Sequence, residues 1–187
     1  MRLTALKIED LPQYTYEDYA QWEGRWELIN GIPYAMSPMP RLKHQRMSGK
    51  IYNYLSELLE NCPYCEVLLP VDWQICEDTI VQPDVLVICE DNIESIDGEK
   101  LLIPPVVVFE ILSPSTVRKD RVLKYQLYEK AGVKYYFIVD ADARSAEVFE
   151  LNRDGYREID TDTFKNGWLT LDIGKCTIEM EFGKILK

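Results

Sequence analysis

The sequence predicts a single domain of the α/β (α+β) class, in which helices and strands share one core. Its 187 residues, of which 47% are hydrophobic and 28% are charged, suit one globular domain spanning residues 1–187. Residues 106–112 form a β-branched and aromatic run bounded by Pro105 and Ser113-Pro114, which indicates a buried central strand. Between residues 44 and 61, apolar side chains recur at helical spacing.

An N-terminal β-hairpin is indicated by two short apolar runs. Strands are expected at residues 25–30 and 32–36, and Asn30-Gly31 between them fits a type I′ turn. Side chains alternate across a strand, so Glu27 lies on the same side as Ile29 and can point inward. Residues 66–76 are expected to form a strand pair or one strand bent around Pro70. The other strands, which end in a C-terminal β extension, are expected at residues 84–89, 134–140, 145–151, 156–160, 168–171 and 176–182.

Two further helices are indicated by the residues at their ends. Thr15 and Asp18 can cap a short N-terminal helix that ends near Glu23. A longer helix is expected from residue 116 or 117 to residue 131, directly after the strand at residues 106–112. Gly132 follows as the residue that closes this helix.

The charge balance argues against broad, nonspecific binding to nucleic acid. The net charge is −11 at pH 7, and this charge repels polyanions overall. A local basic groove is still compatible with it, and two basic clusters could form one, although such clusters more often occur as solvated faces. They consist of Arg41, Lys43, His44, Arg46 and Lys50, and of Arg118, Lys119, Arg121 and Lys124.

The sequence indicates neither an export signal nor a membrane span. Residues 1–14 lack the continuous apolar stretch of a signal peptide, and no apolar run approaches the ~20 residues of a transmembrane helix. We therefore expect a soluble, cytoplasmic protein whose five cysteines are reduced thiols. Cys62 and Cys65 form a C-x-x-C motif, but it follows a helix, where the dipole does not lower a thiol pKa. One such motif and a single histidine fall short of four zinc ligands, so neither a redox nor a zinc role is favoured.

Two carboxylates lie in or beside apolar strands. Glu110 interrupts the strand at residues 106–112, where a buried, unpartnered carboxylate would cost several kcal/mol or take up a proton. Glu110 is therefore either a satisfied core acid or a functional group that needs a cation. Asp84 opens the apolar strand at residues 84–89, and both carboxylates can reach one point if the two strands are neighbours. Two hard oxygen ligands, completed by water, suit Mg²⁺.

Other polar side chains fall on helix faces that could meet this point. Asp120, Lys124 and Tyr128 are spaced at i, i+4 and i+8, so they share one face, and Lys124 could emerge over the strand that carries Glu110. The alternative is a surface Asp120–Lys124 pair, which would contribute only a few tenths of a kcal/mol. His44 falls on the buried face of its helix, where it is either a hydrogen-bonded core residue or a neutral imidazole beside a polar site.

Several separately spaced motifs agree in order along residues 15–151. They are Trp26-Glu27-Leu28-Ile29-Asn30-Gly31, then His44, then Gln82-Pro83-Asp84, then Phe109-Glu110-Ile111-Leu112-Ser113-Pro114-Ser115-Thr116 with Asp120, Lys124 and Tyr128, and finally Ala131-Gly132-Val133 with Tyr135 to Asp140. In this order the motifs resemble the Uma-type restriction endonuclease family of the PD-(D/E)XK nuclease superfamily. The resemblance implies a restriction-endonuclease-like mixed β-sheet flanked by helices.

The resemblance also implies a metal-dependent site. Asp84 and Glu110 are the implied Mg²⁺ ligands, with Mn²⁺ as a substitute, and Glu27 is an accessory acid. The E-x-K position that normally holds lysine is Leu112 here, and Lys124 on the next helix is the implied replacement. The residues implied to be catalytic are Asp84, Glu110, Lys124, Glu27 and His44, with Asp120, Tyr128 and Ser113 in support.

The implied function is hydrolysis of phosphodiester bonds in DNA, or in another nucleic acid, by a Mg²⁺-dependent endonuclease. A homodimer is expected, because cleavage of both strands of a duplex benefits from two copies of the site. Two other interpretations remain open. One is a catalytically silent nucleic-acid-binding or assembly module on the same fold, which the low basicity favours, and the other is a glycosidase that uses Glu110 with a second carboxylate.

Overall fold

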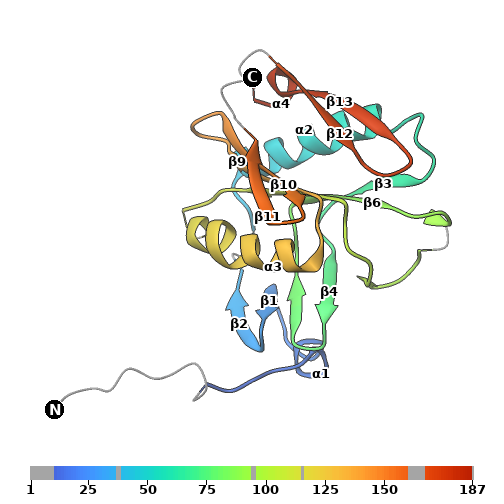
Figure 1. The fold of residues 1–187 in the computed structure, drawn as a ribbon. Helices are drawn as coiled ribbons and strands as arrows, with labels where there is room; N and C mark the ends of the chain where they lie inside the picture. Colours follow the sequence, from blue (N-terminus) through green and yellow to red (C-terminus); the bar gives the residue numbers. More distant parts are fainter. Residues whose placement is uncertain (1–10, 37–38, 94–95, 115, 160–166, 187) are drawn as a thin grey trace.

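The computed structural model describes residues 11–36, 39–93, 96–114, 116–159 and 167–186. Two predictions concern residues outside this part of the chain. Residues 1–10 make up most of the segment that argues against a signal peptide, and Asp160 ends an expected strand. The fold is a mixed α+β arrangement, which confirms the predicted class. Its layers can be followed in Figure 1.

The central layer is a six-stranded mixed sheet with the strand order β11-β10-β9-β8-β6-β3. Strand β8 runs parallel to β9, and the other neighbouring pairs are antiparallel. Every residue of β8 is buried, because other elements cover both faces of this central strand. The strands are β3 (Cys65–Leu68), β6 (Val85–Cys89), β8 (Val107–Ile111), β9 (Tyr135–Asp140), β10 (Ser145–Asn152) and β11 (Gly155–Ile159).

A five-stranded sheet with the order β2-β1-β5-β4-β7 lies below the central sheet in the view of Figure 1. Its first hairpin turns at Asn30, with φ of 51°, and at Gly31, with φ of 71°, which confirms the predicted type I′ turn. The sequence does not predict β5 and β7, because such short strands show no clear alternation. The strands are β1 (Trp26–Ile29), β2 (Ile32–Ala35), β4 (Asp72–Cys76), β5 (Thr79–Val81) and β7 (Lys100–Leu101).

Side chains of the central sheet alternate between two separate cores. Val107 and Phe109 of β8 pack into the core on the side of α2, where Ile51 also lies. Val108 points to the opposite core, which it shares with Tyr128. The elements that cover the first core are α2 (Leu42–Leu58), β12 (Trp168–Asp172), β13 (Thr177–Glu181) and α4 (Phe182–Leu186).

The long helix after β8 changes type along its length. It begins at Val117 and Arg118, which agrees with the predicted start at residue 116 or 117, and then passes into the π-helix η3 (Lys119–Lys124) and the α-helix α3 (Tyr125–Ala131). The π-helical stretch is not predicted from the sequence. Gly132 closes the helix, as predicted, with φ of 85°. Only glycine adopts this left-handed conformation without a steric penalty on Cβ.

The N-terminal helix α1 (Tyr16–Tyr19) is shorter than the sequence predicts. It has the expected cap, in which the Thr15 N–H donates to the Asp18 carboxylate at 2.9 Å. It ends at Tyr19 instead of continuing to about Glu23. Among the helices in the described part of the chain, none is long and apolar enough to cross a membrane.

The cysteines depart from the expectation of reduced thiols. Cys62 is joined to Cys176 and Cys65 to Cys89 as disulfides, whereas Cys76 is free and exposed. The paired residues are 114 and 24 positions apart in the sequence. Without the fold, the cysteine spacing gives no means of choosing these partners.

Candidate functional site

Two carboxylates meet because neighbouring strands carry them at matching positions. Strands β6 and β8 pair in an antiparallel register that sets Val85 opposite Phe109, so Asp84 and Glu110 are the next opposed residues. Both therefore fall on the side of the sheet that faces η3 and α3. The Ile111 N–H donates to Asp84 Oδ2 at 2.8 Å, which fixes the position of this carboxylate at the end of β6.

The π-helix η3 brings two lysines and an aspartate toward the same point. In an α-helix, at ~100° per residue, residues five apart point about 140° away from each other. A π-helix closes its hydrogen bonds between residues five apart, so Lys119 and Lys124 both reach Glu27. Asp120 lies between them in the sequence and is 1% exposed.

Lys124 occupies the centre of this arrangement. Its Nζ lies 2.7 Å from Glu110 Oε1, 2.7 Å from Glu27 Oε1 and 4.0 Å from Asp120 Oδ1. The Tyr128 hydroxyl donates to the same Glu110 Oε1 at 2.7 Å. The predicted i, i+4, i+8 face is therefore confirmed as a buried face, and the alternative of a surface Asp120–Lys124 pair is wrong.

Glu27 enters the site from the other sheet. It lies on β1, on the side expected from its alternation with Ile29, and its side chain is fully buried. Lys119 donates to Oε2, and the backbone N–H of Gln82 donates to Oε1 at 3.1 Å. The carboxylate thus connects the five-stranded sheet to η3 and to the segment that leads into β6.

His44 approaches Asp84 from the first turn of α2. Its Nε2 lies 3.1 Å from Asp84 Oδ2, and the two side chains are 17% and 15% exposed. Lys119 is 12% exposed, whereas Glu27, Glu110 and Lys124 are all at most 4% exposed, so the solvent-facing side of the site is formed by His44, Asp84 and Lys119. Burial lowers the pKa of His44, but the hydrogen bond and charge of Asp84 outweigh this effect, so the net pKa is raised.

Burial and local charge shift the pKa values of the other site residues. Burial raises the pKa of Glu110 well above its ordinary value, and it also raises the pKa of Asp120. Burial acts in the same direction on Glu27, but the two lysine ammonium groups outweigh it, and the pKa of Glu27 is lowered. Burial opposes the charged form of Lys124, yet the surrounding carboxylates raise its pKa well above normal. The surrounding carboxylates therefore favour the charged form of Lys124.

The donor set has the composition of a site for a divalent cation. The four carboxyl groups of Glu27, Asp84, Glu110 and Asp120 outnumber the two ammonium groups of Lys119 and Lys124. In the described part of the chain, Asp120 Oδ1 and His44 Nδ1 are buried without a hydrogen-bond partner. Buried polar atoms are normally satisfied, so these two atoms are candidates for contact with a ligand or with water.

The structure brings together the five side chains that the sequence suggests as catalytic. Of the supporting residues, Asp120 and Tyr128 lie among them. Ser113 instead lies in the turn after β8, where its backbone N–H and its hydroxyl both contact Thr116 Oγ1. Lys119 is the residue that sequence reasoning missed as a member of the site, because its place on this face depends on the π-helix.

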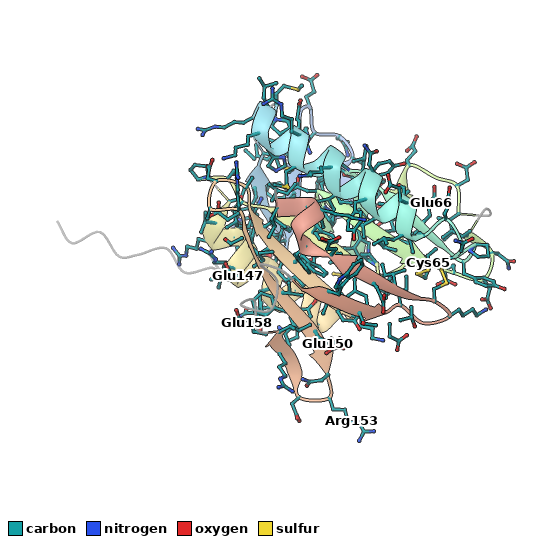
Figure 2. The ribbon with its side chains drawn as sticks, turned by 90° about the horizontal axis from the view of Figure 1, so that it is seen from above. Cys65, Glu66, Glu147, Glu150, Arg153 and Glu158 are labelled. Atoms are coloured by element: carbon teal, nitrogen blue, oxygen red, sulfur yellow. A yellow bond between two sulfur atoms is a disulfide. The ribbon has the colours of Figure 1, made fainter. Side chains whose placement is uncertain are left out.

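Acidic side chains pair with members of both basic clusters of the sequence. Lys119 and Lys124 of the second cluster are directed into the acidic site. Arg121 pairs with Glu147 on β10, and Lys43 of the first cluster pairs with Asp142. Figure 2 shows Glu147 together with Glu150 and Glu158 over the β10–β11 region.

Residues 16–178 match the model of the Uma2 family, which is described as a putative restriction endonuclease. An uncharacterized protein of Synechocystis sp. PCC 6803, slr1290, is 28% identical over 151 residues, which span 77% of each protein.

A solved structure shares the fold. It is described as a putative nuclease belonging to DUF820 from Anabaena variabilis, and it matches with a TM-score of 0.75 at 16% identity, covering 92% of this chain and 97% of that one. The matched family segment contains the whole acidic site, and the match supports a nuclease function in general, with a nucleic acid as the substrate class. The chain belongs to the Uma2 family, whose members are described as putative restriction endonucleases.

Proposed function

We propose that this protein is a divalent-cation-dependent endonuclease that hydrolyses phosphodiester bonds in DNA. The observation that supports this proposal best is the meeting of Asp84, Glu110 and Lys124, which come from two strands and a helix. Carboxylate oxygens suit Mg²⁺, and Mn²⁺ is the expected substitute. The site holds more carboxyl groups than ammonium groups, which favours such a cation.

Asp84 and Glu110 are the residues that would hold the cation, with Glu27 as a further acid. In the described part of the chain, the hydrogen bonds to Glu110 converge on Oε1, and those to Asp84 on Oδ2. The second oxygen of each carboxylate is therefore available to a ligand. When bound, the cation supplies positive charge to the phosphoryl group and to the attacking water.

The surrounding residues hold these acids and supply further charge. His44 orients Asp84, and Tyr128 orients Glu110, so both carboxylates are fixed before a substrate arrives. Lys124 would hydrogen-bond the attacking water and offset the negative charge that develops on the phosphate. Lys119 also pairs with Glu27, so the attraction between Glu27 and the ammonium of Lys124 is weaker than it would be without Lys119.

A cleavage assay tests the proposal directly. Supercoiled plasmid, linear duplex, single-stranded DNA and RNA would each be incubated with the protein in Mg²⁺, in Mn²⁺ and in excess chelator. We expect nicking of DNA that requires the cation and that is lost in Asp84→Asn, Glu110→Gln and Lys124→Met. Glu147→Gln is the matched control, because it removes an acid that contacts Arg121 instead of the site.

The same assay separates the alternative functions. Cleavage at the parent rate by the folded Asp84→Asn protein would exclude the assigned site. A parent protein that cleaves none of these substrates but still retards DNA in a gel would favour the silent binding module. Circular dichroism and melting curves for each variant show whether a loss of cleavage reflects the site or a loss of the fold.

A further inference from the structure

A second cluster of metal-binding side chains lies at the other end of β6. Asp84 precedes this strand and Cys89 ends it, so the cluster is roughly 16 Å from the acidic site at ~3.3 Å per residue. Cys65 begins the edge strand β3 and lies directly opposite Cys89. Figure 2 shows Cys65 with neighbouring sulfur atoms near the end of α2 and the tip of the β12–β13 hairpin.

Four cysteines from distant parts of the chain meet at this point. The sulfur atoms of Cys62, Cys65 and Cys176 all lie within 4.8 Å of one another, and Cys65 is bonded to Cys89. Four thiolates around a tetrahedral Zn²⁺, with Zn–S distances of ≈ 2.3 Å, lie about 3.8 Å apart. Three of the four sulfurs thus already lie at about the spacing that one zinc ion requires, and the fourth, that of Cys89, is held next to Cys65.

Two hydrogen-bonded turns present the cysteines. The Cys65 N–H donates to the Cys62 carbonyl at 3.1 Å, which closes the C-x-x-C segment into a tight turn. In the β12–β13 hairpin, the Ile173 N–H donates to the Cys176 carbonyl at 2.9 Å, and Gly174 supplies a φ of 90° between them. A C-x₂-C turn combined with two further cysteines is the ligand pattern of closed, structural zinc sites.

We propose that Cys62, Cys65, Cys89 and Cys176, as thiolates, form a structural Zn²⁺ site that attaches the β12–β13 hairpin to the central sheet. In the described part of the chain, β12 and β13 form hydrogen-bonded strand pairs only with each other, and side-chain packing in the core under α2 connects them to the central sheet. Cys176 is the ligand that the hairpin supplies. Because all four ligands come from the protein, the site has no open position for catalysis.

A zinc site and two disulfides are alternative forms of the same four sulfurs. A phosphine reductant donates two electrons to each disulfide and, with one water, yields two thiols and a phosphine oxide. The four thiols then release their protons as they bind Zn²⁺. A mononuclear ion fits the close spacing of the sulfurs better than an iron–sulfur cluster, which places several irons and sulfides between its thiolates.

Metal analysis of the full-length protein tests this proposal. Protein purified without oxygen, in a phosphine reductant and without chelator, should contain about one zinc per chain by mass spectrometry. Cys176→Ser and Cys62→Ser should each lose most of this zinc, and Cys76→Ser should retain it, because Cys76 is exposed and unpaired. Replacement of the zinc by Co²⁺ in the unmutated protein should give intense thiolate-to-cobalt absorption, which tests the site without any substitution.

Three results would overturn the zinc site. One is reduced, folded protein that binds neither Zn²⁺ nor Co²⁺. Another is zinc content that Cys176→Ser leaves unchanged, and the third is iron with acid-labile sulfide in place of zinc. The result does not depend on the proposed nuclease function, because the Asp84→Asn, Glu110→Gln double variant should lose cleavage and keep its zinc.

Discussion

Lys124 Nζ lies 2.7 Å from Glu110 Oε1, although the two side chains are only 2% and 4% exposed. A buried ion pair depends on both partners, because removal of one leaves the other charge without compensation in a medium of low dielectric. Glu27 makes a second contact with the same ammonium at 2.7 Å. Lys124 therefore has a structural role as well as the chemical role that we propose.

Substitution of Lys124 should separate these two roles. Lys124→Met keeps an unbranched apolar stem and removes the charge, so we expect the free energy of unfolding at neutral pH to fall by about 3–5 kcal/mol. Addition of Glu110→Gln should recover part of this stability, because the amide carries no charge, but it should not restore cleavage. Urea denaturation followed by circular dichroism measures both changes. A double variant as unstable as Lys124→Met would show that the Glu110 charge is not what Lys124 offsets.

Asp84→Asn should remove metal binding and leave the fold unchanged. The amide oxygen can still accept the Ile111 N–H, which donates to Asp84 at 2.8 Å in the parent. We expect Mn²⁺ affinity to fall and cleavage to slow by about 100-fold or more, because a bound cation contributes several kcal/mol to the transition state. Calorimetric titration with Mn²⁺ and single-turnover cleavage measure these effects. Mn²⁺ binding of parent strength in this variant would place the cation elsewhere.

The sequence predicts the acidic site well where its geometry follows from strand and helix periodicity. Glu110 stands out because it interrupts the apolar run of β8, and Asp84 because it directly precedes the apolar strand β6. The spacing of Asp120, Lys124 and Tyr128 correctly indicates a shared face, since a four-residue step returns to nearly the same side of a helix. These features are local, so a single sequence is enough to show them.

What the sequence does not predict depends on contacts between distant segments or on a change of helix type. Lys119 lies five residues before Lys124. In an α-helix these two side chains would point in different directions, and they share a face only because this segment is a π-helix. Cys89 and Cys176 approach the C-x-x-C motif only after β6 and the C-terminal hairpin are in place. No local pattern carries this information, because it arises from the tertiary fold.

Tyr128→Phe should reveal how strongly Glu110 is held. The change removes the hydroxyl that donates to Glu110 Oε1 at 2.7 Å, while the ring can keep its stacking on Trp73. We expect a loss of about 2 kcal/mol in the free energy of unfolding, because a buried hydrogen bond to a charged acceptor is removed. The matched control is Tyr125→Phe, whose hydroxyl makes a longer contact of 3.4 Å with the Tyr156 carbonyl. Equal losses in the two variants, measured by urea denaturation, would argue against a special role for the Glu110 contact.

Two glycines offer a test of backbone conformation apart from packing. Gly49 lies inside α2 and Gly132 follows α3, and at both positions an added Cβ would meet no described atom within 4 Å. Gly49→Ala should stabilise the protein by about 1 kcal/mol, because alanine loses less conformational entropy in a helix. Gly132→Ala should destabilise it by about 1 kcal/mol, because the φ of 85° places Cβ in the disfavoured left-handed region. Urea denaturation measures the change in the free energy of unfolding for each variant. Because neither substitution creates a close contact, changes of opposite sign would arise from backbone conformation. Changes of the same sign would contradict this explanation.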